Sequence, residues 1–168
     1  MKTNTLLALV LGLLGFALTG GGAQKKEAPI AVSPAPQVAA VAPIFQSYAD
    51  FKWDKILPDL GADSPEISIL RVDPVTHATQ LMIRTPTAIH VRKHWHSANE
   101  THTIITGTAT MACEGQRMEL NPGSFNFMPA KTVHEAWLPA GSLTFVTVDG
   151  AWDIHWVEGA PSAADLTK

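Results

Sequence analysis

Cysteine and charge are both scarce in this sequence of 168 residues, and it has no basic run. The single cysteine, Cys113, excludes a disulfide within the chain. Charged residues make up only 16% and the formal net charge is -3, so we expect no surface for nucleic acid or for an anionic membrane. Apolar residues make up 46%, which at this length favours one compact domain with a sizeable core.

An apolar run from Leu6 to Leu18 is too short to span a bilayer comfortably. Lys2 precedes the run and the small residues Gly20–Ala23 follow it, an order typical of a secretory signal peptide. We therefore expect a signal peptide over residues 1–23 and an exported protein, periplasmic or secreted, with no membrane association after cleavage. An uncleaved anchor is the alternative.

Four segments follow the expected signal peptide. Residues 24–43 are rich in proline and alanine and have no apolar period, which is typical of a linker. Residues 44–63 form an N-terminal extension, residues 64–160 carry the regular pattern of the main domain, and residues 161–168 are a C-terminal tail.

The extension carries a weak helical pattern. Apolar residues at Ile44, Tyr48 and Phe51 predict a short helix that ends at Pro58. The alternation in Phe51–Trp53 is the competing strand pattern.

The main domain reads as about ten strand-length runs separated by turn residues. The turns include Asp73-Pro74, Asn121-Pro122-Gly123 and Pro139-Ala140-Gly141. Gly107, Gly115 and Gly123 recur at the spacing of hairpins. Many short strands with frequent turns predict an all-β sandwich or barrel.

Two histidines, His94 and His96, begin the most informative stretch of the sequence. Alternate side chains of a strand share a face, so both can reach one ion. The small residues Ser97–Asn99 predict a turn, after which Glu100 can close on the same point, and His134 is the candidate fourth ligand. Each residue alone is more often an ordinary half-buried polar side chain, and only their joint spacing predicts a metal site.

At these residues the chain resembles the cupin family. The first family motif, His-x-His, three or four residues, Glu, six residues, Gly, is met by His94, His96, Glu100 and Gly107. A Gly-x-Trp-x-Ile segment at Gly150–Ile154 is similar to that of small exported single-domain cupins. The resemblance implies a jelly-roll barrel, and it supplies the choice of barrel that the strand pattern leaves open.

The second cupin motif is met in part. Gly123, Pro129 and His134 stand at the family spacing, whereas Lys131 occupies the position of the middle glycine and Leu138 that of the asparagine. These departures bear on the turn after Pro129 and on a substrate contact from the asparagine position, and they leave the metal ligands in place. A cupin that keeps the fold and binds metal weakly or not at all is the competing interpretation.

Three imidazoles and one carboxylate suit one divalent transition metal, namely iron, manganese, nickel, copper or zinc, and do not suit calcium. Four ligands on an octahedral ion leave two positions for water, dioxygen or substrate. The alternation of faces also places His102, and behind His94 the residues Arg92 and His90, toward the same interior, although a solvated charge near a strand end is the favoured interpretation of Arg92. We predict His102 as the catalytic residue, which orients Glu100 or transfers a proton, unless the strand twists it toward water.

Three functional hypotheses follow. The first is a metal-dependent enzyme acting on a small organic molecule, dioxygenase-like or isomerase-like. The second is a non-catalytic protein that binds or senses a small molecule through its metal. The third, a structural module that forms a homodimer, rests on the fold alone.

Overall fold

The computed structural model describes residues 42–167. The signal peptide predicted over residues 1–23 and nearly all of the linker predicted over residues 24–43 lie outside the described residues. Within the described part of the chain, no helix is both long and apolar enough to cross a membrane.

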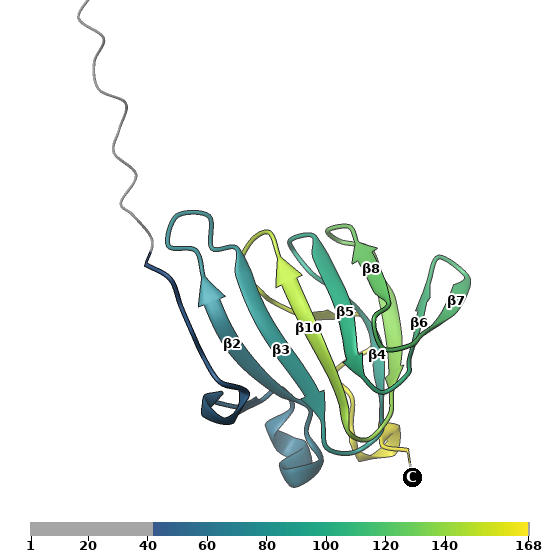
Figure 1. Cartoon of the computed structure of the whole chain (residues 1–168). Helices are drawn as coiled ribbons and strands as arrows, with labels where there is room; N and C mark the ends of the chain where they lie inside the picture. The colour runs from purple at the N-terminus through teal and green to yellow at the C-terminus, as the bar shows by residue number, and fades with distance from the viewer. Residues whose placement is uncertain (1–41, 168) are drawn as a thin grey trace, which may run out of the picture. The chain divides into compact units, whose positions relative to one another are not determined.

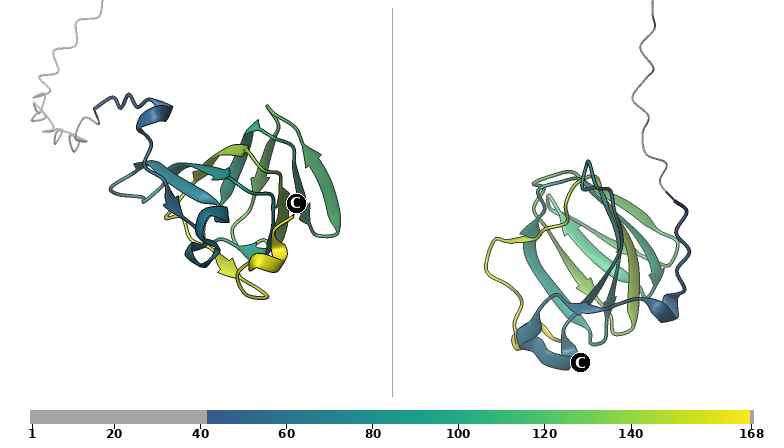
Figure 2. Two further views of the ribbon diagram at one scale, coloured as in Figure 1. Left: turned by 90° about the horizontal axis from the view of Figure 1, so that it is seen from below. Right: turned by 90° about the vertical axis from the view of Figure 1, so that its left-hand side faces the viewer.

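The described chain folds into two antiparallel β-sheets that face each other (Figures 1 and 2). The larger sheet has the strand order β1-β2-β3-β10-β5-β8. Its strands are β1 (Asp54–Lys55), β2 (Glu66–Val72), β3 (Thr79–Thr85), β5 (Glu100–Thr106), β8 (Phe125–Met128) and β10 (Ser142–Val148).

The smaller sheet has the strand order β11-β4-β9-β6-β7. Consecutive strands therefore cross between the sheets, as β4 to β5 and β8 to β9 do, which is the winding of a jelly roll. The strands of this smaller sheet are β4 (Ile89–Trp95), β6 (Ala109–Cys113), β7 (Gln116–Leu120), β9 (His134–Leu138) and β11 (His155–Trp156).

The prediction of an all-β domain is confirmed, and the predicted runs match β2 to β10 with small shifts at their ends, whereas only two residues of the last run, predicted over 152–157, form β11. The helix predicted in the extension is wrong. The structure has a single 3₁₀ turn there, η1 (Tyr48–Asp50), and Pro58 begins a second 3₁₀ helix, η2 (Pro58–Asp63), instead of ending a helix. An extended path lets the rings of Phe51 and Trp53 pack together, with Arg84 4.2 Å from the Trp53 ring centroid.

The core lies between the two sheets and has two apolar clusters. One is centred on Ile104 and Met111, and the other on Leu81 and Val146, which are fully buried. In β10 every second side chain is buried, as expected for a strand between β3 and β5 with one face toward the interior.

Both ends of the described chain are joined to the sheets. β1 pairs with β2, so the extension contributes a strand to the larger sheet. At the C-terminal end, η3 (Ala163–Asp165) is followed by a bridge between Leu166 and Ile89 of β4.

Candidate metal centre

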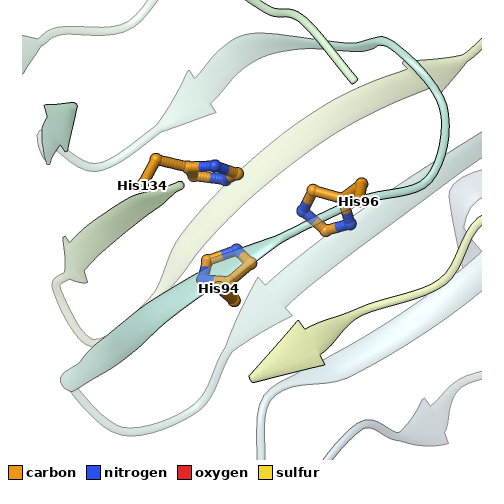
Figure 3. A group of neighbouring side chains, drawn as sticks. All are labelled: His94, His96 and His134. Carbon is orange, nitrogen blue, oxygen red and sulfur yellow. The ribbon is translucent and has the colours of Figure 1, made fainter. Parts of the chain in front are cut away.

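Three buried histidines meet at the interior face of the smaller sheet. His94 and His134 are paired across β4 and β9, and His96 follows the end of β4. One ring nitrogen from each lies within 4.8 Å of the others (Figure 3). Three neutral imidazoles at this separation can hold one metal ion.

Backbone carbonyls orient all three rings. Nδ1 of His94 donates to the carbonyl of Arg92 at 2.7 Å, Nδ1 of His134 donates to that of Thr132 at 3.0 Å, and Nδ1 of His96 donates to that of Asp153. A carbonyl oxygen only accepts, so Nδ1 carries the proton in each ring and Nε2 keeps a free lone pair. This is the tautomer that a metal ligand requires.

Glu100, at the start of β5, supplies a carboxylate beside the histidines. Its Oε2 lies 3.0 Å from Nε2 of His96 and 3.2 Å from Nε2 of His102, but neither contact has the geometry of a hydrogen bond. Oε2 is thus buried without a hydrogen-bond partner among the described residues. Such an orphaned carboxylate oxygen is costly unless a cation satisfies it, so the donor set fits a metal ion.

The environment holds these groups in the charge states that metal binding needs. Burial, helped by the neighbouring His134, lowers the pKa of His94 to about 3, and burial lowers the pKa of His134 to about 4. Burial alone would raise the pKa of Glu100, but the nearby His102 and His96 outweigh it and lower this pKa to about 2. At neutral pH His94 and His134 are therefore neutral and the Glu100 carboxylate is ionised.

His102 lines the same interior, as the alternation of faces predicted. Its Nδ1 donates to Oδ1 of Asn126 at 2.9 Å, and Nδ2 of Asn126 in turn lies 2.9 Å from Sδ of Met111. Burial lowers the pKa of His102, but the Glu100 carboxylate outweighs burial and the pKa is raised overall. His102 is thus held between an amide and the carboxylate, and its catalytic role stays a prediction.

Arg92 and His90 do not line the interior, so the placement by alternation is wrong for both, and the outward position favoured for Arg92 is the one observed. Arg92 forms an ion pair with Asp165 at 2.7 Å, and His90 lies 2.8 Å from Glu135. The reason is a register shift between β4 and β9. An extra residue in β4 changes which face the next side chain occupies.

The histidines and Glu100 stand at one side of a cavity of about 80 Å³. Most of the rest of its wall is apolar and comes from both sheets and from residues 56, 57 and 65, which precede β2. Thr144 adds a hydroxyl, and no lysine or arginine among the described residues lines the cavity.

A model of the DUF4437 family, a domain of unknown function, matches residues 37–155. The chain belongs to this family. No curated protein matches it.

Solved structures show that the domain has the cupin fold. KdgF from a Halomonas species is 17% identical with a TM-score of 0.54, over 64% of this chain and 94% of that one. An RmlC-like cupin from Shewanella frigidimarina is 16% identical with a TM-score of 0.55, over 66% and 93%. The DMSP lyase DddQ from Ruegeria pomeroyi is 21% identical with a TM-score of 0.51, over 68% and 61%. The predicted cupin fold is confirmed.

The departures from the second cupin motif have clear structural consequences. Lys131 has a φ of 65°, the left-handed conformation that a glycine adopts readily, and its N–H donates to the His96 carbonyl at 2.8 Å. The turn after Pro129 is therefore kept, at the cost of some backbone strain. Leu138 lines the cavity, so an apolar side chain stands where the motif has an amide.

Three residues of this site were missed from the sequence. Trp152 and Trp156 line the cavity, and Asn126 contacts His102. The Gly-x-Trp-x-Ile segment was a signal for Trp152. Asn126 had none, because it faces His102 only through the pairing of β5 with β8.

Proposed function

We propose that this cupin is a metal-dependent enzyme acting on a small organic molecule, by dioxygenase-like or isomerase-like chemistry. The observation that carries the proposal is the convergence of three oriented Nε2 atoms beside an orphaned carboxylate oxygen in a cavity. A structural site would have closed its coordination sphere with protein ligands, whereas this one opens onto space for a small molecule.

The residues that would hold the ion are His94, His96, His134 and, as the fourth ligand, Glu100. A divalent iron, manganese, nickel, copper or zinc ion bound there supplies a Lewis acid with open coordination positions. The chain itself excludes bulk water by its apolar wall and keeps each imidazole in the binding tautomer.

His102 is the residue that we assign to proton transfer. Its Nε2 faces Glu100 and the cavity, and Asn126 holds its Nδ1–H. A histidine fixed on one side and facing the ligand space on the other can take or give a proton at Nε2.

The names of structural neighbours do not select a reaction. DddQ is named as a lyase of DMSP, but an identity of 21% carries the fold alone. The reaction of this chain is therefore proposed from its own site.

Elemental analysis of the purified protein tests the metal directly, and we expect about one divalent ion per chain. Oxygen uptake by the iron-loaded protein with a panel of phenolic and keto-acid compounds then tests the dioxygenase. Oxygen uptake with product formation supports the enzyme. The second candidate is a metal-dependent binding or sensing protein, which the apolar Leu138 at the asparagine position favours. Saturable ligand binding without oxygen uptake or product, with every divalent ion tested, supports this candidate.

We also propose that the protein is exported, and that it acts in the periplasm or outside the cell. This proposal rests on residues 1–23, in which a charged residue, an apolar run and small residues follow one another as in a signal peptide. Mass spectrometry of the protein from its native host should give a chain that begins near Gln24, and an intact Met1 would contradict the proposal. A homodimer is proposed from the fold alone, and sedimentation of the purified protein tests it.

A further inference from the structure

The sheets do not hold the four ligand residues equally. His94 and His134 are paired directly across β4 and β9, and Glu100 is paired with neighbours on both sides at the start of β5. His96 lies beyond the last residue of β4, outside any strand (Figure 3). The position of His96 relative to the other ligands therefore depends on what holds the turn over residues 97–99.

Asn99 holds this turn by four hydrogen bonds to two other segments. Its N–H and its Nδ2 donate to the two oxygens of the Asp149 carboxylate at 2.9 and 2.5 Å, and its carbonyl accepts the Asp149 N–H at 3.2 Å. Its Oδ1 accepts the Ala130 N–H at 2.9 Å. Asn99 does not line the cavity, so it can act on the metal centre only through other residues.

Both segments that Asn99 holds also bond to His96. In one of them, Lys131 donates its N–H to the His96 carbonyl at 2.8 Å. In the other, the Asp153 carbonyl accepts the Nδ1–H of His96, and the Asp153 carboxylate accepts the Ser97 N–H at 2.8 Å. Asn99 therefore restrains both the backbone and the ring of His96 through these neighbours.

The two partners of the Asn99 side chain require an amide. The Ala130 N–H needs an acceptor, and the Asp149 carboxylate needs a donor. An aspartate at position 99 would serve Ala130 but would set a second carboxylate against that of Asp149. An asparagine satisfies both partners at once, and they fix which way its amide points.

We propose that Asn99 is a positioning residue of the metal centre, which holds His96 in place relative to His134 and so raises the affinity for the ion. The inference rests on the proposed function, because it concerns the same metal site. Residues that hold a ligand in this indirect way commonly change metal affinity by about ten- to 100-fold when they are replaced.

Zinc titration of matched variants measures this role. Asn99→Ala removes both side-chain contacts, so we expect the Kd of zinc to rise about ten- to 100-fold. Asn99→Asp keeps the size of the side chain but opposes two carboxylates, and should raise the Kd at least about tenfold. Adding Asp149→Asn to Asn99→Asp swaps the amide and the carboxylate and restores every hydrogen bond. In this double variant the Kd should return to within about threefold of that of the unmodified protein.

Asp73→Ala is the control for a loss of turn stability alone. Asp73 accepts the N–H groups of Val75 and Thr76 at 3.0 and 2.9 Å and pairs with Arg71 at 3.1 Å, in the turn between β2 and β3. It does not line the cavity. Asp73→Ala should lower the free energy of unfolding, as Asn99→Ala does, but it should leave the Kd of zinc within about twofold.

Hydrogen exchange of the metal-free protein tests the coupling without any ion. The Lys131 N–H bonds to the His96 carbonyl, and Asn99 bonds to neither group. Asn99→Ala should nevertheless speed exchange of the Lys131 N–H at least about fivefold, because the two turns are no longer joined. Asp73→Ala should leave this rate unchanged.

The inference is overturned if Asn99→Ala binds zinc as tightly as the unmodified protein, if the double variant does not recover the affinity, or if the Lys131 exchange rate does not change. Should Asn99→Ala fail to fold, Asp149→Asn alone takes its place, since it keeps the size of the side chain and sets a donor against Asn99. We expect its Kd of zinc to rise about tenfold, and an unchanged Kd overturns the inference.

Failure of the proposed function is distinguishable from failure of this inference. If the unmodified protein binds no zinc or other divalent ion, the metal-dependent function is removed. Faster Lys131 exchange in Asn99→Ala then still supports Asn99 as the residue that positions His96, and unchanged exchange overturns it. Zinc binding that is equal in Asn99→Ala and the unmodified protein keeps the function and overturns the inference.

Discussion

Strands β4 and β5 lie on either side of the ligand turn, and they follow the alternation of faces to different extents. Along β5, Glu100, His102 and Ile104 all line the cavity, as strict alternation requires. Along β4, Val91 and His94 line it although they are three residues apart. The rule is therefore reliable within an uninterrupted strand and fails across a bulge.

The pairing with β9 shows where the rule fails. Val91 pairs with Ala136 and His94 pairs with His134, so three steps along β4 match two steps along β9. The extra residue turns His94 inward and leaves Arg92 on the outer face, where it meets Asp165. A bulge beside a ligand redirects one side chain into the site.

The largest expected effect is a difference in metal binding between substitutions on the two sides of the bulge in β4. His94→Ala removes a ligand with a buried, oriented lone pair, and we expect the affinity for zinc to fall by at least about 100-fold. His90→Ala, on the same strand but facing Glu135, is the matched control and should keep about full occupancy. Elemental analysis and zinc titration measure both. Equal metal content in the two variants would mean that the site is elsewhere.

The regular strand gives the next largest effect. His102→Ala should lower turnover, or ligand affinity if the protein is a binder, by about ten- to a thousand-fold with metal content nearly intact. His102→Gln should restore a purely orienting role, because an amide still forms hydrogen bonds, and should not restore proton transfer. Thr101→Val is the control on the opposite face, where the Thr101 hydroxyl bonds to that of Thr147. Unchanged activity in both His102 variants would remove the assigned role.

Backbone strain beyond the end of β4 predicts a smaller effect. Lys131→Gly relieves a left-handed residue while keeping the N–H that donates to the His96 carbonyl. We expect the free energy of unfolding to rise by about 0.5–1 kcal/mol in denaturant titrations, with metal affinity unchanged. Lys131→Ala, which keeps the strain, should leave stability within about 0.5 kcal/mol of the starting value.

The smallest effect is expected from substitution of Arg92, which lies on the outward side of the bulge. Arg92→Leu breaks the ion pair with Asp165 and should cost about 0.2–1 kcal/mol, with no loss of metal. The Arg92 guanidinium and the Ser162 N–H lower the pKa of Asp165 from 3.8 to about 2. This contribution is therefore complete above about pH 4 and is lost as the pH falls toward 2. Between about pH 4 and pH 2, denaturation curves of Arg92→Leu should show a smaller loss of the free energy of unfolding than those of the unmodified protein. An equal loss in the two proteins would contradict the ion pair.

Local patterns predicted much of this molecule. The turn residues and the alternation of apolar side chains located most of the strands, and the spacing of His94, His96 and His134 located the histidine cluster that could hold a metal ion. These features succeed because strand periodicity and turn chemistry act over a few residues. The face of His102 followed from the same rule, since β5 is uninterrupted as far as Ile104.

Contacts between distant residues were decided by tertiary structure alone. The bulge in β4 depends on its partner β9, the support of His102 depends on Asn126 in β8, and the contacts of Asn99 depend on the segments before β9 and β11. The helix predicted in the extension does not form, because Trp53 packs on Arg84 of β3. Strand pairing within each sheet joins residues that are far apart along the chain, and the sequence around each residue does not indicate its partner.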